Sequence, residues 1–210
     1  FDAARGFIRT FKEIFGKDFY LEIMLHPKIA PSDPNTAIQP QLRVAAALIR
    51  LSIETDTPLI VTNDVHFLNR EDAEIHDLLL CISTNRTMSD TKRLRYTHQE
   101  YFKSADEMLQ TFRQQYPGVA NEYMAIAKLP QAAPQGDGKP VPSMLSEDEY
   151  LAIVTQAMET TVRIAEEVEV YSIKRDPVMP NFPVPPEFPD AAAYLRHLVY
   201  QGAQERWGTP

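Results

Sequence analysis

Hydrophobic residues recur at intervals of three and four along several stretches of the chain, which predicts amphipathic helices. Two of the later stretches begin with a capping box, in which Ser104 or Ser146 is followed three residues later by a glutamate. We expect helices over residues 4–15, 41–55, 69–83, 104–112, 146–167 and 191–207.

Two short apolar runs lack helical spacing. Residues 19–25 read FYLEIML, and residues 59–62 read LIVT. Both are typical of strands, and the second is typical of a buried one. The order is strand, loop, helix and strand, which is the unit of a parallel sheet or barrel. The fold class is therefore α/β, and a right-handed crossover predicts Glu22 and Asp64 on neighbouring parallel strands, at the same sheet edge.

Two proline-rich segments interrupt the regular pattern. Residues 131–142, QAAPQGDGKPVP, indicate a surface loop or a disordered insertion. Residues 177–189, PVMPNFPVPPEFP, indicate an extended linker, because proline cannot donate to a ladder and biases its predecessor away from helix. A long N-terminal part and a short C-terminal part are therefore expected.

The composition is that of a soluble globular protein. Of the 210 residues, 44% are apolar and 24% are charged. No run of about 18 apolar residues occurs, so we expect a cytoplasmic protein without a membrane partner. The single cysteine, Cys81, lies among leucine and isoleucine, which favours a buried side chain in a reducing compartment. Because the chain begins at Phe1 rather than at a methionine, we expect it to be a segment of a longer protein.

The charge balance limits what the chain does with nucleic acid. With 21 basic and 29 acidic residues the net charge is −8, whereas binding of a phosphate backbone needs a concentrated positive surface. The segment itself is not expected to be the main contact with nucleic acid. We interpret the basic residues Lys92, Arg93 and Arg95 as a solvated hairpin.

Asp64 and His66 follow the second expected strand directly. On an extended backbone, residues i and i+2 point to the same side, so the carboxylate and the imidazole converge past the carboxyl end of the strand. Active sites of parallel α/β folds assemble at this edge, and the two side chains are candidate metal ligands. The alternative is local: Asp64 caps the next turn and His66 hydrogen-bonds nearby. Two ligands do not make a metal site, so both interpretations stay open, and no residue is given a catalytic role.

Three further residues near this edge carry polar side chains. His76 lies at helical spacing among apolar residues, and a core or boundary histidine is the favoured interpretation. Glu22 and His26 end the first expected strand and are candidates for contact with the Asp64–His66 pair. For these two, a salt bridge or solvent exposure is the favoured interpretation.

The order of motifs along the chain is more specific than any one of them. The motifs are FYLEI, PLIVTNDVHFLNREDAEIHDLLLCI, KRLRY, EYFKSADEM, TTVRIAEEVEV, NFPVP and AAAYLRHLVYQGAQERWG. In this order they resemble the bacterial DNA polymerase III alpha subunit, and the resemblance covers nearly the whole chain. The chain departs from it mainly at residues 116–147, which look longer than the family's usual connection and are interpreted as an insertion.

The resemblance implies a place in a very large replicative polymerase. Residues 1–180 are similar to the C-terminal half of its polymerase and histidinol phosphatase (PHP) domain, a distorted parallel barrel of strands and helices. Residues 181–190 would form the proline-rich linker, and residues 191–210 would begin the polymerase core. In this family the carboxylates that bind magnesium and drive nucleotidyl transfer lie downstream, so the segment alone is not expected to polymerise DNA.

In the family, Asp64 and His66 match the final Asp-x-His of a set of PHP metal ligands whose other members, including a His-x-His pair, lie upstream. The resemblance implies zinc, manganese or iron at this site and magnesium at the polymerase site. Some members have lost this histidine together with metal binding, whereas this chain keeps both residues. Some members are credited with 3′ to 5′ exonuclease activity in the PHP domain, and in others the domain only stabilises the polymerase or docks a separate exonuclease.

The partners that the resemblance implies are DNA and deoxynucleoside triphosphates, bound by the full-length protein, and other replicase subunits, namely a proofreading exonuclease and the sliding clamp. Two other classes are considered. A free-standing PHP-type metal-dependent phosphoesterase would share the barrel and Asp-x-His, but its chain should end soon after the barrel. A non-catalytic interaction module that docks a proofreading exonuclease would keep the fold with an incomplete ligand set. The sequence on either side of the segment distinguishes the three.

Overall fold

A computed structural model describes residues 1–27, 38–129 and 140–208. The chain divides into two units, Phe1–Glu169 and Val170–Pro210. Each unit is described by itself. The expected loop at residues 131–142 lies mostly outside the described residues.

A pair of parallel strands lies in the first unit. Strand β1 (Leu21–Ile23) pairs with β2 (Leu59–Val61), with Leu21 opposite Leu59, and α2 (Ile38–Thr55) lies between them in the sequence. The expected parallel pairing is confirmed, although both strands are shorter than the apolar runs. Asp64 lies beyond the end of β2 rather than within it. In the described part of the chain the sheet has these two strands, so it is a small α/β element, and the PHP barrel stays a proposal.

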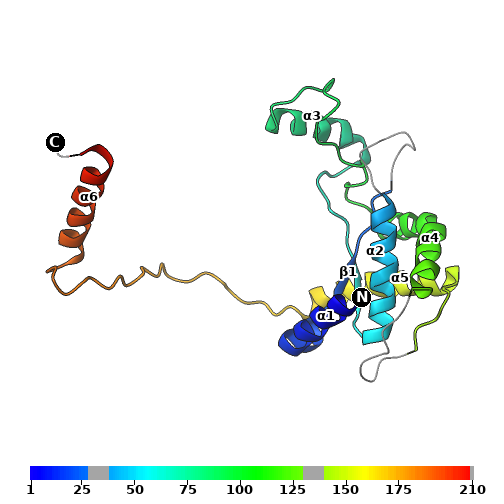
Figure 1. Cartoon of the computed structure of the whole chain (residues 1–210). Helices are drawn as coiled ribbons and strands as arrows, with labels where there is room; N and C mark the ends of the chain where they lie inside the picture. The colour runs from blue at the N-terminus through cyan, green and yellow to red at the C-terminus, as the bar shows by residue number, and fades with distance from the viewer. Residues whose placement is uncertain (28–37, 130–139, 209–210) are drawn as a thin grey trace. The chain divides into compact units, whose positions relative to one another are not determined.

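The strand pair lies among four helices, two of which pack against it (Figure 1). They are α1 (Asp2–Phe15), α2, α4 (Ala105–Ala127) and α5 (Glu147–Glu167), and a 3₁₀ turn, η1 (Gly16–Asp18), follows α1. Helix α2 packs against α4 and β1, and α5 packs against β2 and α4. The shared core is apolar and includes the fully buried side chains of Ile49, Phe112, Val119, Tyr123, Tyr150 and Val154.

The two predicted capping boxes are confirmed. The Ser104 hydroxyl accepts from the Glu107 amide, and Ser146 does the same with Glu149. Helix α5 ends at Glu167 as expected, but the prediction that the other helix ends at Phe112 is wrong.

Helix α4 continues to Ala127 through Pro117 because tertiary packing outweighs the lost backbone donor. Gly118 lies against Leu42 of α2 so closely that a Cβ there would come within 2.6 Å of the Leu42 side chain. Residues 116–127 of the expected insertion belong to this helix, and Val119, Tyr123 and Ile126 supply core side chains.

The α3 lobe, defined as residues 68–98, stands apart from these helices (Figure 1). It contains η2 (Arg70–Asp72), α3 (Ala73–Ser83) and the loop that follows. Asn69 and Asp72 form a capping box at its start, as expected of Asn69. Helix α3 buries Ala73, Asp77 and Cys81, so the predicted burial of Cys81 is confirmed.

The apolar stripe of α3 points outward. Ile75, Leu78, Leu79 and Ile82 are 50–69% exposed. The hydrophobic periodicity therefore predicts the helix but not the face of it that is buried.

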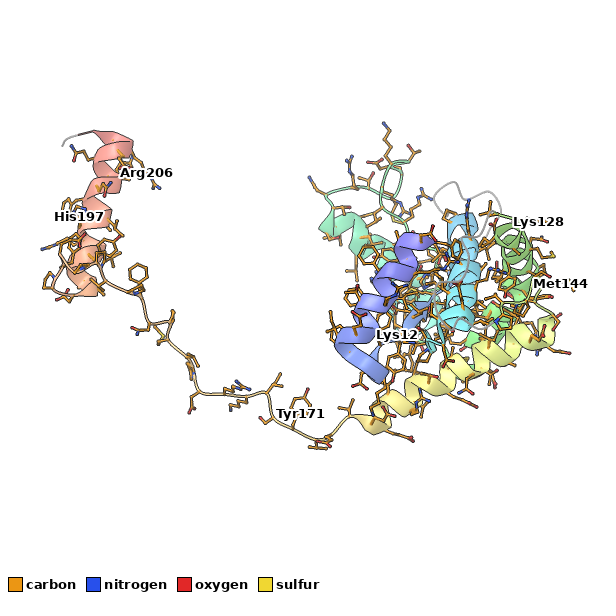
Figure 2. All side chains as sticks on the ribbon, turned by 60° about the horizontal axis from the view of Figure 1, so that its bottom comes forward. Lys12, Lys128, Met144, Tyr171, His197 and Arg206 are labelled. Carbon is orange, nitrogen blue, oxygen red and sulfur yellow. The ribbon has the colours of Figure 1, made fainter. Side chains whose placement is uncertain are left out.

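The second unit consists of an extended segment and one helix. Residues 170–185 form neither helix nor strand. Helix α6 (Ala191–Trp207) is capped by Asp190, whose carboxylate accepts from the Ala193 amide. Figure 2 shows the side chains of this unit, including Tyr171 and His197. The Phe188 ring packs on Tyr194 and on His197, with centroids 4.9 and 5.0 Å apart. Within the described ranges, no helix has the length and apolar content that crossing a bilayer requires.

Candidate functional site

The structure brings Asp64 and His66 together in the turn after β2. The His66 Nδ1 atom lies 2.8 Å from the backbone oxygen of Asp64 and 3.7 Å from its Oδ2. The two side chains are 31% exposed for His66 and 53% exposed for Asp64. The two side chains thus converge, as the i, i+2 spacing predicts. The same turn also contains a local hydrogen bond of His66, as the interpretation without a metal predicts.

The tautomer of His66 follows from its partners. A backbone carbonyl only accepts, so Nδ1 carries the proton and donates it to Asp64. The Nε2 atom is then the acceptor and lies 3.2 Å from the Tyr96 hydroxyl. A metal-ligating histidine ordinarily donates its second ring N–H in this way, so His66 fits a role as a ligand through Nε2.

Aromatic rings surround the His66 imidazole. The Tyr96 and His76 ring centroids lie 4.6 and 5.5 Å from that of His66, and Phe67 packs on His76 at 5.2 Å. His76 is half-buried, which confirms the interpretation as a boundary histidine. Burial, followed by the nearby charge of His66, lowers the pKa of His76. The neutral form of His76 is therefore favoured.

The ligand set that the described residues supply is incomplete. Among them, no group of three or more histidine, cysteine, aspartate or glutamate side chains is arranged to hold a metal ion. Asp64 and His66 offer one carboxylate and one imidazole nitrogen, whereas a transition metal usually takes about three or four protein ligands. The pair fits part of a metal site whose remaining ligands would have to come from elsewhere.

Behind the pair lies a polar cluster that the sequence did not reveal. It consists of His26, which follows β1, of Asn63, which precedes Asp64, and of Lys103. The Asn63 Oδ1 atom lies within hydrogen-bonding distance of both His26 Nε2 and Lys103 Nζ. His26 is buried, so the expectation that it faces solvent is wrong, and among the described residues its ring contacts Asn63 rather than forming a salt bridge. Glu22, in contrast, is exposed and accepts from the Thr62 hydroxyl at 2.6 Å. Burial lowers the pKa of His26, and it lowers the pKa of Lys103 to about 8.

An ion pair fills the inner side of the α3 lobe. Arg93 Nη2 lies 2.7 Å from Asp77 Oδ2, and His98 Nε2 lies 3.6 Å from the same oxygen. Arg93 is buried, so the interpretation of this basic cluster as a solvated hairpin is wrong for Arg93 and holds for the exposed Lys92. Arg93 is therefore committed to Asp77 rather than to a phosphate.

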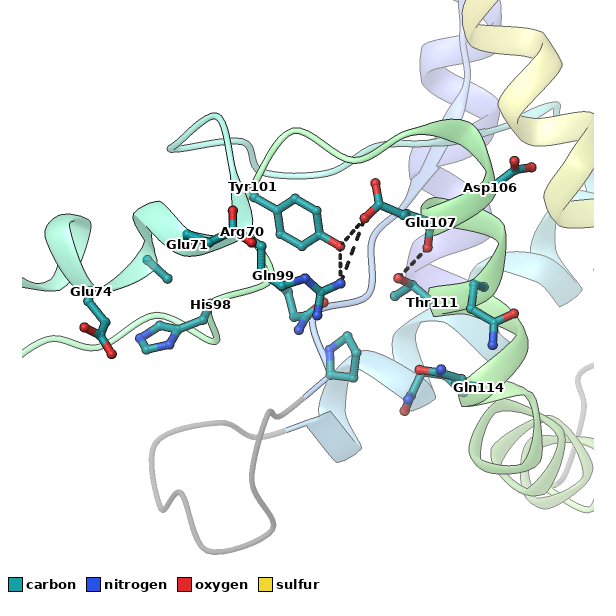
Figure 3. A pocket seen from close by; sticks show the side chains of 14 residues that line it. Arg70, Glu71, Glu74, His98, Gln99, Tyr101, Asp106, Glu107, Thr111 and Gln114 are labelled. Carbon is teal, nitrogen blue, oxygen red and sulfur yellow. Dashed lines mark hydrogen bonds and ion pairs between the residues drawn. The ribbon is translucent and has the colours of Figure 1, made fainter.

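An open polar cleft of about 1040 Å³ lies between the α3 lobe and α4 (Figure 3). The side chains of Arg70, Tyr101 and Glu107 point toward one another there, with Arg70 Nη2 donating to the tyrosine hydroxyl at 2.5 Å and that hydroxyl donating to Glu107 at 3.0 Å. The acidic residues of the lining are Glu71, Glu74, Asp106 and Glu107. This excess of carboxylates disfavours a nucleic-acid backbone in the cleft.

The sequence of the chain is similar to that of known bacterial proteins. No family model matches the chain. A DNA polymerase III subunit alpha from Borreliella burgdorferi is 32% identical over 209 residues, which are 99% of this chain and 14% of that protein. The same subunit from Treponema pallidum is 29% identical over 95% of the chain, and the one from Helicobacter pylori strain J99 is 26% identical over 98% of it. The chain is similar to a segment of DNA polymerase III alpha subunits.

The resemblance inferred from the order of motifs is thereby confirmed. The chain spans 13–14% of the length of these three alpha subunits. Most of each of them has no counterpart in the 210 residues, so the activity of a whole alpha subunit cannot be assigned to this chain directly.

The sequence predicts the convergence of Asp64 and His66 but not the polar groups around them. The i, i+2 spacing at a strand end was sufficient for Asp64 and His66. The cluster of His26, Asn63 and Lys103 joins residues 37 and 40 positions apart, and no local pattern signals such a contact. One local feature pointed to Asn63 as part of the site: it lies between the expected strand and Asp64.

Proposed function

We propose that this chain is part of the alpha subunit of a bacterial DNA polymerase III, a cytoplasmic replicative DNA-directed DNA polymerase. The observation that carries the proposal is the similarity over 93–99% of the chain to proteins that share this one name. The partners of the longer protein would be DNA, deoxynucleoside triphosphates, a proofreading exonuclease and the sliding clamp. Its polymerase site would use magnesium.

Template-directed nucleotide incorporation tests this proposal. The longer protein that contains the chain should extend a primer, whereas the purified 210-residue chain should not. A longer protein that folds, binds primed DNA and yet incorporates no nucleotide would contradict the proposal. Incorporation by the 210-residue chain would contradict the placement of the polymerase carboxylates downstream.

Residues 1–180 would be the C-terminal part of the PHP barrel, with residues 116–147 as an insertion, and residues 191–210 would begin the polymerase core. The parallel β1–β2 pair with its α2 crossover supports the barrel, because such a crossover is the repeating unit of (β/α) barrels. In a structure of the longer protein, β1 or β2 should pair with a further parallel strand. An antiparallel neighbour would contradict the barrel.

In the longer protein, Asp64 and His66 would serve as two ligands of a zinc, manganese or iron site. The hydrogen bond from His66 Nδ1 to the Asp64 carbonyl supports this role, because it orients Nε2 as the ligand atom. A bound divalent ion would supply the Lewis acidity for 3′ to 5′ hydrolysis of a phosphodiester. The Asp64 carboxylate would supply an oxygen, and the rings of His76 and Tyr96 would hold the imidazole in place.

The double variant Asp64→Asn/His66→Ala of the longer protein tests the metal role. Elemental analysis should find less bound metal, and any 3′ to 5′ hydrolysis should fall, while nucleotide incorporation and the melting temperature stay near those of the wild type. Asp176→Asn, an exposed change in the extended segment of the second unit, is the matched control. Equal metal content in the wild type and a well-folded double variant would show that the pair is structural, and would favour a PHP domain that supports the polymerase or docks an exonuclease.

A further inference from the structure

The side-chain amide of Asn63 uses both of its ends. Its Nδ2 atom donates to the backbone oxygens of Tyr101, at 2.7 Å, and of Gln99, at 3.4 Å. Its Oδ1 atom lies 3.4 Å from Lys103 Nζ and 3.2 Å from His26 Nε2. The orientation of the amide is unambiguous, because backbone carbonyls only accept and a lysine ammonium only donates.

These contacts tie three separate parts of the chain together. His26 follows β1, Asn63 follows β2, and residues 99–103 precede α4. On the far side of the pair, the Glu100 carbonyl accepts from the amides of His66, at 2.7 Å, and of Phe67, at 3.4 Å. Residues 99–103, called the strap, therefore hold residues 63–67 from both ends of the turn that carries the pair.

The strap is itself anchored to the helical core. Tyr101 is 4% exposed, and its hydroxyl donates to Glu107 in the first turn of α4 (Figure 3). Glu107 also accepts from the Ser104 amide in the capping box of α4. The Lys103 ammonium lies 4.3 Å from the centre of the Tyr101 ring and donates to the Gln99 carbonyl. Movement of the strap would break these contacts together.

We propose that Asn63 is a positioning residue that, by binding the strap, holds the backbone of Asp64 and His66 in the geometry needed to bind a metal ion. The inference rests on the proposed role of the pair. An asparagine suits the task because it alone offers two donors to the strap carbonyls and an acceptor to Lys103 from one short side chain. Replacement by alanine leaves the carbonyls of Gln99 and Tyr101 and the buried Lys103 without these partners.

The test uses the longer protein that contains this chain, with Asn63→Ala and the milder Asn63→Ser, which keeps one hydroxyl donor. Asn121→Ala, at an exposed position of α4, is the matched control. Binding of Mn²⁺ alone is measured after removal of other metals, and hydrogen exchange of peptides that cover residues 63–67 is measured on the metal-free protein. We expect about 10-fold or greater weakening of Mn²⁺ binding in Asn63→Ala, since loss of a group that orients a ligand typically costs about 10- to 100-fold.

The exchange measurement separates positioning from general damage. The amides of His66 and Phe67 should exchange faster in Asn63→Ala, exchange in α5 should be unchanged, and Asn63→Ser should be intermediate in both measurements. Faster exchange throughout the unit would overturn a positioning role, because it would report unfolding.

The double variant Asp64→Asn/His66→Ala distinguishes the two failures. If it loses Mn²⁺ while both Asn63 variants bind like the wild type, the positioning role is overturned and the metal role of the pair stands. If the double variant and the Asn63 variants all bind Mn²⁺ like the wild type, the metal role fails, and the positioning role fails with it.

Discussion

The helical core and the α3 lobe are both built from apolar helices, but the lobe also buries a charged side chain and leaves its large apolar side chains exposed. In the core, α4 and α5 turn Phe112, Tyr150 and Val154 inward, and all three are 0% exposed. In the lobe, α3 turns Asp77 inward against Arg93, while Leu79 is 56% exposed. Burial is thus decided by what a helix has to pack against. The core helices meet one another, whereas α3 meets a loop that carries an arginine.

The energetic consequence differs between the two regions. Apolar burial tolerates loss of volume at the cost of a cavity, whereas a buried ion pair that loses one partner leaves an uncompensated charge. The core should therefore dominate the global stability of the first unit. The lobe should open locally, in a manner that depends on the Asp77–Arg93 pair.

The largest effect is expected from Phe112→Ala in the core. Removal of a fully buried aromatic side chain should lower the free energy of unfolding by about 3–5 kcal/mol, through lost burial and the cavity left behind. Denaturant unfolding of the 210-residue chain measures the change. Leu79→Ala in the lobe is the matched control and should shift the midpoint little. A similar loss for both variants would show that the two regions do not differ.

The sequence predicted helix positions in both the core and the lobe better than it predicted which helix faces are buried. Capping boxes and periodicity predicted α5 within a residue, and α2 within three residues at its start, because local signals define helix ends. Helix α4 continues beyond its predicted end at Phe112, and the packing of Gly118 against Leu42 of α2 is a tertiary contact that no local pattern reveals. The buried face of α3 was missed because it depends on Arg93, 16 residues after Asp77.

In the candidate site, too, the sequence predicts local contacts but not contacts between distant parts of the chain. The convergence of Asp64 and His66 follows from local backbone geometry, so the sequence was sufficient. Asn63 and Lys103 are 40 residues apart and meet only after the strap crosses the end of β2. Contacts of this kind depend on the tertiary fold, and no spacing rule predicts them.

A smaller, local effect is expected from Asp77→Ala. Without its partner, the buried Arg93 guanidinium should destabilise the lobe by about 3 kcal/mol, while the core keeps most of its stability. Limited proteolysis within residues 73–98 should become faster before the global unfolding midpoint moves. Asp90→Ala, which removes the exposed pair with Arg86 in the same lobe, is the control and should leave the cleavage rate nearly unchanged.

Acid should open the lobe in the same way. Burial raises the pKa of Asp77, but the hydrogen bond and charge of Arg93, with the charge of His98, outweigh it and hold the pKa below its usual range. A depressed pKa means that the pair stabilises the lobe fully above the unfolded value of about 3.9 and loses this contribution as pH falls through the folded value. Proteolysis of residues 73–98 by an acid-active protease should therefore accelerate below about pH 4 in the wild type, and less so in Asp77→Ala.

The smallest effect is expected from Leu79→Ser on the outer stripe of α3. In the 210-residue chain this side chain is 56% exposed, so the free energy of unfolding should change by no more than about 0.5 kcal/mol. Val154→Ser, the same kind of change at a fully buried position of α5, should cost several times more, because it loses apolar burial and places a hydroxyl in the core. The two variants are compared by denaturant unfolding under one condition. A loss above about 1 kcal/mol for Leu79→Ser would mean that the stripe is packed against something in solution, and the contrast between an inward-facing core and an outward-facing lobe would fail.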